Sequence, residues 1–426
     1  MRPEEVTGLG RLAADAAGGI ALQVRELHEE IARRAFRAVG VGAAPVQVVH
    51  DQIAERAYDV ARGLTTAIVR GGARAVSAAG PPDAPSIDAS LRGRLALGAL
   101  NGAFGDHLHR DGNALRFGMT LRRGGRDIDP AEEDLAAAYP DATSRIAVFL
   151  HGLCETDEAW KIGAQRHIPY GARLHAELGF TPLYVRYNTG RHISENGREF
   201  ARLLDHLAER WPVEVHEIAL IGHSMGGLVS RSACHYADGS TWPSKVRHVF
   251  MLGAPHKGAP LEKAATAATG ALSRLPETRG LARALKARSS GIKDLGHGYL
   301  VDEDWLDQDP DAFVQQAGSV IPFLSCAKHY FICATVTREA DAPVGRLVGD
   351  LLVLRESAWG QARRGERMQF PVEHYSHVGD CNHFELLNHP AIYEQIRLWL
   401  TGRPALPAPK RELPPVALAP EHELLG

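Results

Sequence analysis

From about residue 145 onward, short apolar runs alternate with longer stretches of helical periodicity. A parallel sheet buried between helices produces this alternation, because each strand is apolar throughout and each crossover between strands is a helix. The pattern therefore predicts an α/β fold with a mostly parallel central sheet flanked by helices. The expected strands span residues 146–150, 183–187, 217–221, 246–252, 329–336 and 370–375, and the expected helices span residues 168–178, 197–210, 226–236 and 390–400.

A helical region precedes this alternation. Apolar residues recur every three or four positions in residues 20–31, and residues 53–76 and 91–104 are rich in Ala. The polar faces mix positive and negative side chains, which favours docking on a neighbouring domain over lying on a membrane surface. We therefore expect residues 1–110 to form a helical N-terminal region that caps the α/β domain. Its apolar faces also permit peripheral membrane contact.

The α/β domain is expected to span residues 111–402, with weakly alternating residues 115–123 as its first strand. An insertion at about residues 257–309 is rich in Ala and Leu and then in charged residues. It is expected to form a lid over an apolar pocket, and a plain surface excursion is the alternative. Residues 403–426 are rich in Pro and predict a disordered tail.

The overall composition excludes several classes of protein. A net charge of −3 over 426 residues provides no broad basic field, so nucleic acid is not an expected partner. The five cysteines are scattered without paired spacing, which predicts neither a disulfide framework nor a zinc site. The first residues lack a secretory apolar segment, and no run of about 18 apolar residues predicts a membrane span. These features favour a cytoplasmic enzyme.

The strongest chemical signal is the sequence Gly222-His223-Ser224-Met225-Gly226. An apolar run precedes it and a helical stretch follows it, which is the strand-turn-helix context of a nucleophile elbow. Glycines flank such a serine because the sharp turn leaves no room for side chains on either side. A chance glycine turn is the alternative, but the context favours Ser224 as a nucleophile that stands above the sheet.

Two backbone amides are expected to stabilise the negative charge that develops on a substrate oxygen. The helix after Ser224 points its amino terminus at the reacting centre, which assigns the amide of Met225 to this role. The second donor is expected just after the His151-Gly152 pair that ends the strand at residues 146–150. Leu153 is the first candidate, and Cys154 is the neighbouring alternative.

A serine hydroxyl is a poor nucleophile, so an imidazole must accept its proton and a carboxylate must orient that imidazole. In folds with this elbow the order along the chain is Ser, acid, His. Asp350 lies in a loop after the strand at residues 329–336, where the acid belongs. Asp341 and Asp380 compete with it, and a loop carboxylate that only caps a backbone amide is the plain alternative.

His383 follows the last expected strand and precedes the final expected helix, where the base belongs. The chain has 21 histidines, so its place in the chain, and not its residue type, singles it out. His377 and His389 lie on either side of it and rank second and third, because neither lies as centrally between the strand and the helix.

Several motifs resemble the branch of α/β-hydrolases that holds lipases and glycolipid-anchor inositol deacylases. The similarity covers about residues 145–400. In that branch the acid loop often reads G-D-G-x-V, whereas this chain has Leu351 in place of the second glycine. The LGTPH-x-G segment of the branch has Ala in place of Thr in this chain. The matching segments are VFLHGL at residues 148–153, residues 187–197, GHSMGG at 222–227, LGAPHKGAP at 252–260 and, late in the chain, His383.

The resemblance implies hydrolysis of carboxylic esters through an acyl-serine intermediate, with lipids or other hydrophobic acyl esters as substrates and without a metal or another cofactor. We therefore expect an esterase or lipase that acts with Ser224, Asp350 and His383 and needs no obligate protein partner. Acyl transfer or thioester hydrolysis would use the same residues. The alternative of another class is a non-catalytic lipid-binding or scaffold protein.

Overall fold

The structure is a computed structural model that describes residues 1–16, 85–131, 133–258, 288–306, 318–360, 368 and 370–402. The helices expected at residues 20–31 and 53–76, most of the expected lid and the tail at residues 403–426 lie outside the described residues. The proposed domain boundaries and the lid therefore stay predictions.

An eight-stranded sheet forms the centre of the described structure, in the order β2-β1-β4-β3-β5-β6-β7-β8. The β1 strand pairs antiparallel with β2 and β4, and every other pair of neighbours is parallel. The prediction of a mostly parallel sheet is thus confirmed. The strands are β1 (Thr120–Arg123), β2 (Arg126–Ile128), β3 (Arg145–Leu150), β4 (Phe180–Arg186), β5 (Glu217–His223), β6 (Val246–Leu252), β7 (Lys328–Ala334) and β8 (Tyr375–Val378).

The central strands are apolar throughout because both faces of the sheet are covered. Along β3, Ile146, Val148 and Leu150 face one core, whereas Ala147 and Phe149 face the other, and all five side chains are fully buried. This alternation is the two-residue period of a strand. It explains why the strand pattern in the sequence reads as uninterrupted apolar runs.

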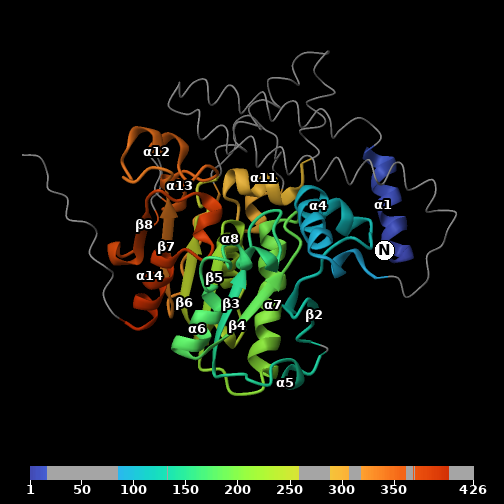
Figure 1. Cartoon of the computed structure of the whole chain (residues 1–426), viewed down its shortest axis with the longest axis horizontal. Coiled ribbons are helices and arrows are strands. Elements are labelled where there is room, and N and C mark those ends of the chain that lie inside the picture. Colours follow the sequence, from blue (N-terminus) through green and yellow to red (C-terminus); the bar gives the residue numbers. More distant parts are fainter. Residues whose placement is uncertain are drawn as a thin grey trace, which may run out of the picture.

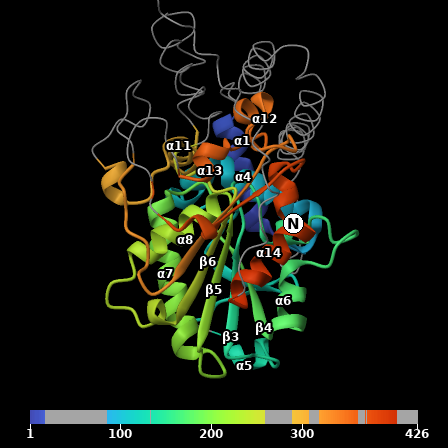
Figure 2. The ribbon, with the colours of Figure 1, turned by 90° about the vertical axis from the view of Figure 1, so that its left-hand side faces the viewer.

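Helices form a layer on each face of the sheet (Figure 2). On one face, α7 (Ile193–Arg210) and α8 (Met225–His235) supply apolar side chains to the core that contains Ile146. On the other face, α6 (Tyr170–Leu178) and α14 (Pro390–Leu400) pack against Phe149 and its neighbours. The layered order of helix, sheet and helix defines the α/β class.

Apart from α5, which lies at the opposite end of the sheet, the further helices gather near the carboxyl ends of the parallel strands (Figure 1). The α4 helix continues beyond the expected end at residue 104, because the chain only kinks at Phe104 (φ −135°) and then resumes the helix. No helix among the described residues is long and apolar enough to span a bilayer. The remaining α-helices are α1 (Pro3–Ala16), α4 (Leu91–Arg110), α5 (Leu135–Ala138), α11 (Ser290–His297), α12 (Pro343–Val348) and α13 (Arg355–Ala358).

The last strand differs from the expectation. The segment at residues 370–375 is not a strand, since Pro371 starts a 3-10 turn at η7 (Val372–His374) and β8 begins only at Tyr375. Proline lacks an amide that could bond to β7, the one neighbour of this edge strand, which favours the turn. Phe370 lies outside the sheet and stacks on Phe331 of β7, with ring centroids 4.0 Å apart. This contact accounts for an apolar residue at a position that is not in a strand.

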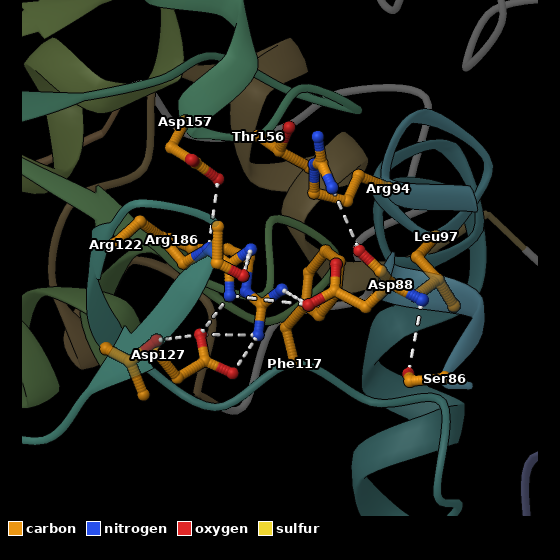
Figure 3. A network of polar contacts seen from close by, with 12 residues as sticks. Ser86, Asp88, Arg94, Leu97, Phe117, Arg122, Asp127, Thr156, Asp157 and Arg186 are labelled. Carbon is orange, nitrogen blue, oxygen red and sulfur yellow. Dashed lines mark hydrogen bonds and ion pairs between the residues drawn. The ribbon is translucent and has the colours of Figure 1, made fainter. Parts of the chain in front are cut away.

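Charged side chains fasten the N-terminal segment to the edge of the sheet (Figure 3). Arg186 at the end of β4 donates to Asp88 at 2.8 Å and to Asp127 at 2.6 Å. Arg122 of β1 donates to Asp127 at 2.8 Å and pairs with Asp157 at 3.4 Å. Both guanidinium groups are buried. The network thus joins the chain just before α4 to β1, β2 and β4.

The described part of the expected lid packs on the body of the domain. Asp294 of α11 contacts His192 at 3.0 Å and accepts the amide of Ile193 at 2.9 Å, at the start of α7. The indole of Trp305 donates to Ser194 at 3.0 Å and stacks on His192. Residues 288–306 are therefore an integral part of the α7 side of the domain.

Candidate active site

Ser224 lies in a sharp turn between β5 and α8. Its backbone has φ 52° and ψ −122°, a conformation that side chains rarely adopt, and its amide donates to the carbonyl of Leu252 at 2.8 Å. A Cβ on Gly222 would overlap the backbone of Gly226, and one on Gly226 would lie 2.5 Å from the carbonyl oxygen of Leu150. The two glycines therefore permit the turn. Ser224 itself is only 6% exposed.

The turn after β3 lies directly against the serine. A Cβ on Gly152 would come within 3.1 Å of the Cβ of Ser224. The amide of Gly152 donates to Glu155 at 2.6 Å, and the amide of Cys154 donates to the hydroxyl of Thr189 at 3.2 Å. Of the two candidate donors, Cys154 therefore already has an acceptor, and Leu153 stays the expected donor in this turn.

The amide of Met225 is the first of α8. The first amides of a helix have no acceptor within the helix, and the helix dipole adds positive potential at that end. The amide therefore suits stabilisation of a negative charge next to Ser224.

Asp350 and His383 form a buried pair. The Nδ1 atom of His383 lies 2.7 Å from Oδ2 of Asp350, and the two side chains are 3% and 1% exposed. The other carboxylate oxygen of Asp350 accepts the amides of Leu352 at 3.1 Å and Val353 at 2.8 Å. The amide of His383 also donates to the carbonyl of Asp350 at 2.9 Å. Both the imidazole and its loop are therefore held by this residue.

The acid loop keeps its shape without the second glycine of the G-D-G-x-V pattern. Leu351 has φ 89°, in the left-handed region that glycine adopts at no steric cost, and Gly349 before Asp350 has φ 61°. The amides of Leu352 and Val353 that turn back to Asp350 hold this conformation. The leucine is tolerated at the expense of local backbone strain.

Two of the competing side chains, those of Asp341 and His377, have other partners. Asp341 pairs with Arg355 at 3.0 Å and is 45% exposed, and the amide of Asp380 donates to the carbonyl of Thr337. The imidazole of His377 lies 2.8 Å from the hydroxyl of Thr335, and burial lowers its pKa to about 4. His389 is the N-cap residue of α14, and its backbone amide donates to the hydroxyl of Tyr170 at 2.8 Å.

Ser224 and His383 both lie next to the residues that end and follow β6. The serine amide is bonded to Leu252, and a Cβ on the next residue, Gly253, would lie 3.1 Å from Cε1 of His383. Among the hydrogen bonds between described residues, none joins the hydroxyl of Ser224 to the imidazole of His383. Such bonds are often long in ligand-free enzymes and tighten when substrate binds.

A second ionisable pair lies beside the first, and the sequence did not single it out. The Nδ1 atom of His223 is 3.1 Å from Oε2 of Glu155, and its Nε2 atom is 3.1 Å from the carbonyl oxygen of His383. His223 is fully buried. Only the spacing of a Glu three residues after Gly152, on the turn that faces the elbow, could have drawn attention to it.

The charges of this second pair support each other. Burial alone would lower the pKa of His223, but the Glu155 carboxylate and the His383 carbonyl outweigh burial and raise it above its usual value. Burial would raise the pKa of Glu155, yet His223 and the amide of Gly152 hold it below its usual value. The raised pKa of His223 and the lowered pKa of Glu155 thus both favour the charged forms of the pair.

The neighbouring His151 is held in the opposite state. Its Nδ1 atom lies 2.9 Å from the carbonyl of Gly152, whereas its Nε2 atom faces the amide of Tyr187 at 3.4 Å and must accept. Burial lowers its pKa to about 4. His151 is thus a neutral structural residue at the base of the turn.

The α4 helix supports the turn from outside. A Cβ on Gly102 would overlap Cys154, with its Cα 2.9 Å away, and one on Gly98 would lie 2.9 Å from the side chain of Thr156. The helix therefore approaches the turn as closely as two backbones can. Within the described ranges, no group of His, Cys, Asp or Glu side chains is arranged to bind a metal ion.

The order of the strands, the serine turn after β5 and the histidine loop after β8 define an α/β-hydrolase fold. Residues 198–307 match the family model of the PGAP1-like alpha/beta domain. The resemblance to the α/β-hydrolase branch of lipases and glycolipid-anchor inositol deacylases is thereby confirmed. No curated protein matches the chain.

Solved structures of esterases and lipases are similar to part of the chain. The mature lipase BlEst2 of Bacillus licheniformis aligns with 60% of this chain and 91% of its own, at 17% identity and a TM-score of 0.37. A lipase-esterase related protein from Clostridium acetobutylicum aligns over 60% and 95%, at 15% identity and a TM-score of 0.32. Phospholipase PlaB from Legionella pneumophila aligns over 50% and 45%, at 17% identity and a TM-score of 0.29.

Proposed function

We propose that the protein is a serine carboxylic ester hydrolase, an esterase or lipase that acts on hydrophobic acyl esters. One observation carries the proposal. The buried Asp350 to His383 contact of 2.7 Å lies beside a serine whose positive φ is that of a nucleophile elbow. The hydrophobic acyl chain is inferred from the resemblance to the lipase branch.

In the proposed reaction Ser224 attacks the ester carbonyl carbon, and Nε2 of His383 accepts the hydroxyl proton. Asp350 holds Nδ1, which leaves Nε2 as the basic nitrogen and stabilises the imidazolium. The amides of Leu153 and Met225 bind the oxyanion of the tetrahedral intermediate. When this intermediate collapses, His383 returns the proton to the departing alkoxide, and an alcohol leaves.

The second half of the reaction repeats these roles with water. His383 accepts a proton from water as the water oxygen attacks the acyl-serine carbonyl, and the proton then returns to the oxygen of Ser224. The products are a carboxylic acid and the free enzyme. All the required groups belong to the chain itself, so the proposed chemistry uses no metal or other cofactor.

The first test compares the wild type with Ser224→Ala on p-nitrophenyl esters from acetate to palmitate. We expect kcat to fall about a thousandfold or more, because loss of the nucleophile removes the acyl-enzyme route. Ser244→Ala changes an exposed serine that bonds only within its own turn and is the matched control. The chain length with the highest kcat/KM distinguishes an esterase from a lipase.

Equal activity of the wild type and Ser224→Ala would contradict the proposal. A fluorophosphonate probe adds a check that does not depend on the substrate, since it should label the wild type and the control but not Ser224→Ala. Failure to label the wild type would favour the alternative of a non-catalytic lipid-binding protein. Ester formation with an added alcohol, in excess of hydrolysis, would instead indicate acyl transfer.

A further inference from the structure

Glu155 and His223 connect three parts of the site. Glu155 lies in the turn after β3 and accepts the amide of Gly152 at 2.6 Å through Oε2. The same oxygen faces Nδ1 of His223 at 3.1 Å. The opposite ring nitrogen of His223 faces the carbonyl of His383 at 3.1 Å. A continuous polar chain therefore runs from the turn after β3, called here the oxyanion turn because Leu153 is its proposed donor, past the serine turn to the loop of His383.

The partners of His223 determine its protonation state. A carbonyl oxygen accepts hydrogen bonds but cannot donate one, and the same holds for an ionised carboxylate. Both ring nitrogens of His223 must therefore donate, which only the imidazolium form can do. The charge is matched by Glu155, whose side chain is 12% exposed, so the two buried ions compensate each other.

The other groups around His223 do not replace Glu155. The imidazole of His383 lies with its ring centroid 4.7 Å away and is itself bonded to Asp350. Asp350 contributes a weaker attraction from further off, and the nearby His151 is neutral. Trp160 packs its ring edge against His223 at 6.4 Å and offers an apolar wall. Glu155 is thus the carboxylate on which the imidazolium depends.

We propose that Glu155 and the imidazolium of His223 are positioning residues that fix the oxyanion turn and the histidine loop relative to Ser224. This inference rests on the proposed function. The pair touches no reacting atom. It acts through the amide of Gly152, which precedes Leu153, and through the carbonyl of His383, so both the oxyanion donor and the base depend on it.

The pair makes the site sensitive to alkaline pH. When His223 loses its proton, one of its two nitrogens can no longer donate, and either the turn or the histidine loop is released. Activity is therefore expected to fall as the pH rises through the pKa of His223. Removing the charge of Glu155 removes the main attraction that keeps His223 protonated, so this fall must move to lower pH.

The test is the pH profile of kcat/KM for the wild type, Glu155→Gln and His223→Gln. We expect Glu155→Gln to lower kcat on the order of a hundredfold, as misplacement of reacting groups does, with little change in KM. Its alkaline limb should lie at lower pH than that of the wild type, and His223→Gln should lack this limb. An equal loss at every pH in Glu155→Gln, with the limb unmoved, would overturn the proposal.

Glu158→Gln is the matched control. Glu158 lies three residues further along, is similarly buried, and pairs with Arg94 at 3.0 Å and Lys161 at 2.9 Å instead of with a histidine. Its alkaline limb should stay where that of the wild type lies. If Glu158→Gln moved the limb as far as Glu155→Gln, the effect would belong to general charge in this turn and the proposal would be wrong.

The charge state can be read without any activity. Nitrogen NMR of labelled protein should show one histidine, absent from His223→Gln, that is an imidazolium at neutral pH and becomes neutral in Glu155→Gln. A neutral His223 in the wild type would overturn the positioning pair even if esters were hydrolysed. Conversely, an imidazolium in a protein that hydrolyses no ester would support the pair and contradict the proposed function.

Discussion

Asp350 divides its carboxylate between two tasks. One oxygen is held by the amides of Leu352 and Val353, and the other faces Nδ1 of His383. Because backbone amides hold the first oxygen, the carboxylate cannot rotate freely and the second oxygen stays directed at Nδ1 of His383. The residue therefore sets both the tautomer and the orientation of the imidazole in the proposed mechanism.

Replacing Asp350 with Asn should lower kcat by about ten thousandfold while the protein stays folded. The amide nitrogen would face Nδ1 and favour the wrong tautomer, so that Nε2 carries a hydrogen and cannot accept the serine proton. Steady-state kinetics on the best p-nitrophenyl ester measure the change. Asp341→Asn alters an exposed carboxylate that pairs with Arg355 and should keep near wild-type kcat. The reverse ranking would exclude Asp350 as the acid.

The sequence indicated the right neighbourhood for these residues because chain order and strand topology are linked. Parallel strands end at the same edge of a sheet, so the residues after β3, β5, β7 and β8 had to meet. Asp350 and His383 do lie together. The spacing of Glu155 after Gly152 only hints at its contact with His223, because the directions of these side chains depend on how two turns pack.

At the scale of elements, α4 packs directly against the turn after β3, through Gly98 and Gly102. Gly102→Ala would place a methyl group 2.9 Å from Cα of Cys154, which the turn can relieve only by moving. We expect kcat/KM to fall roughly tenfold for such a shift. The melting temperature should change little, because the about 1 kcal/mol that alanine adds in a helix opposes the cost of overpacking.

Gly118→Ala is the control for this change, since its new methyl group would meet nothing within 4 Å. It should leave kcat/KM unchanged. Full activity of Gly102→Ala would show that the turn tolerates displacement and that α4 does not support it.

The elements that sequence periodicity predicted well are those buried on both sides. Strand β6 and helix α14 have the expected limits, since apolar pattern and burial coincide there. Strand β8 is short, and none of its residues is fully buried, so its apolar pattern is weak and the stronger signal of Phe370 misplaced it. The hairpin of β1 and β2 is equally short and half-exposed. Tertiary contacts, which periodicity does not report, fix such elements.

At the scale of the whole molecule, buried neutral histidines make the fold sensitive to acid. Burial, with a smaller effect of Arg231, lowers the pKa of His329 to about 3. Between that value and its usual pKa of about 6.5, the unfolded chain binds a proton that the native state refuses. The free energy of unfolding should therefore fall as the pH drops below about 6.5, by up to about 1.4 kcal/mol per pH unit for each such histidine. His151, His248 and His377 have pKa values lowered to about 4 and act in the same sense.

Urea unfolding between pH 7 and pH 4.5 measures this slope. His329→Gln should reduce the slope of the unfolding free energy against pH by up to about 1.4 kcal/mol per pH unit, which corresponds to one bound proton. His216→Gln, at a side chain that is 64% exposed, should not reduce it. An identical slope in the wild type and His329→Gln would mean that His329 binds its proton equally well in both states.

The order of the site along the chain has a consequence for biosynthesis. The chain is made from its amino terminus, so β3, β4 and β5 are available to pair well before β8 and the loop of His383 have been translated. A nascent chain can thus form the serine turn while it still lacks the imidazole that would activate it. If Ser224 acts as proposed, hydrolytic activity begins only when translation has passed the last strand, and the ribosome-bound intermediate does not attack acyl esters around it.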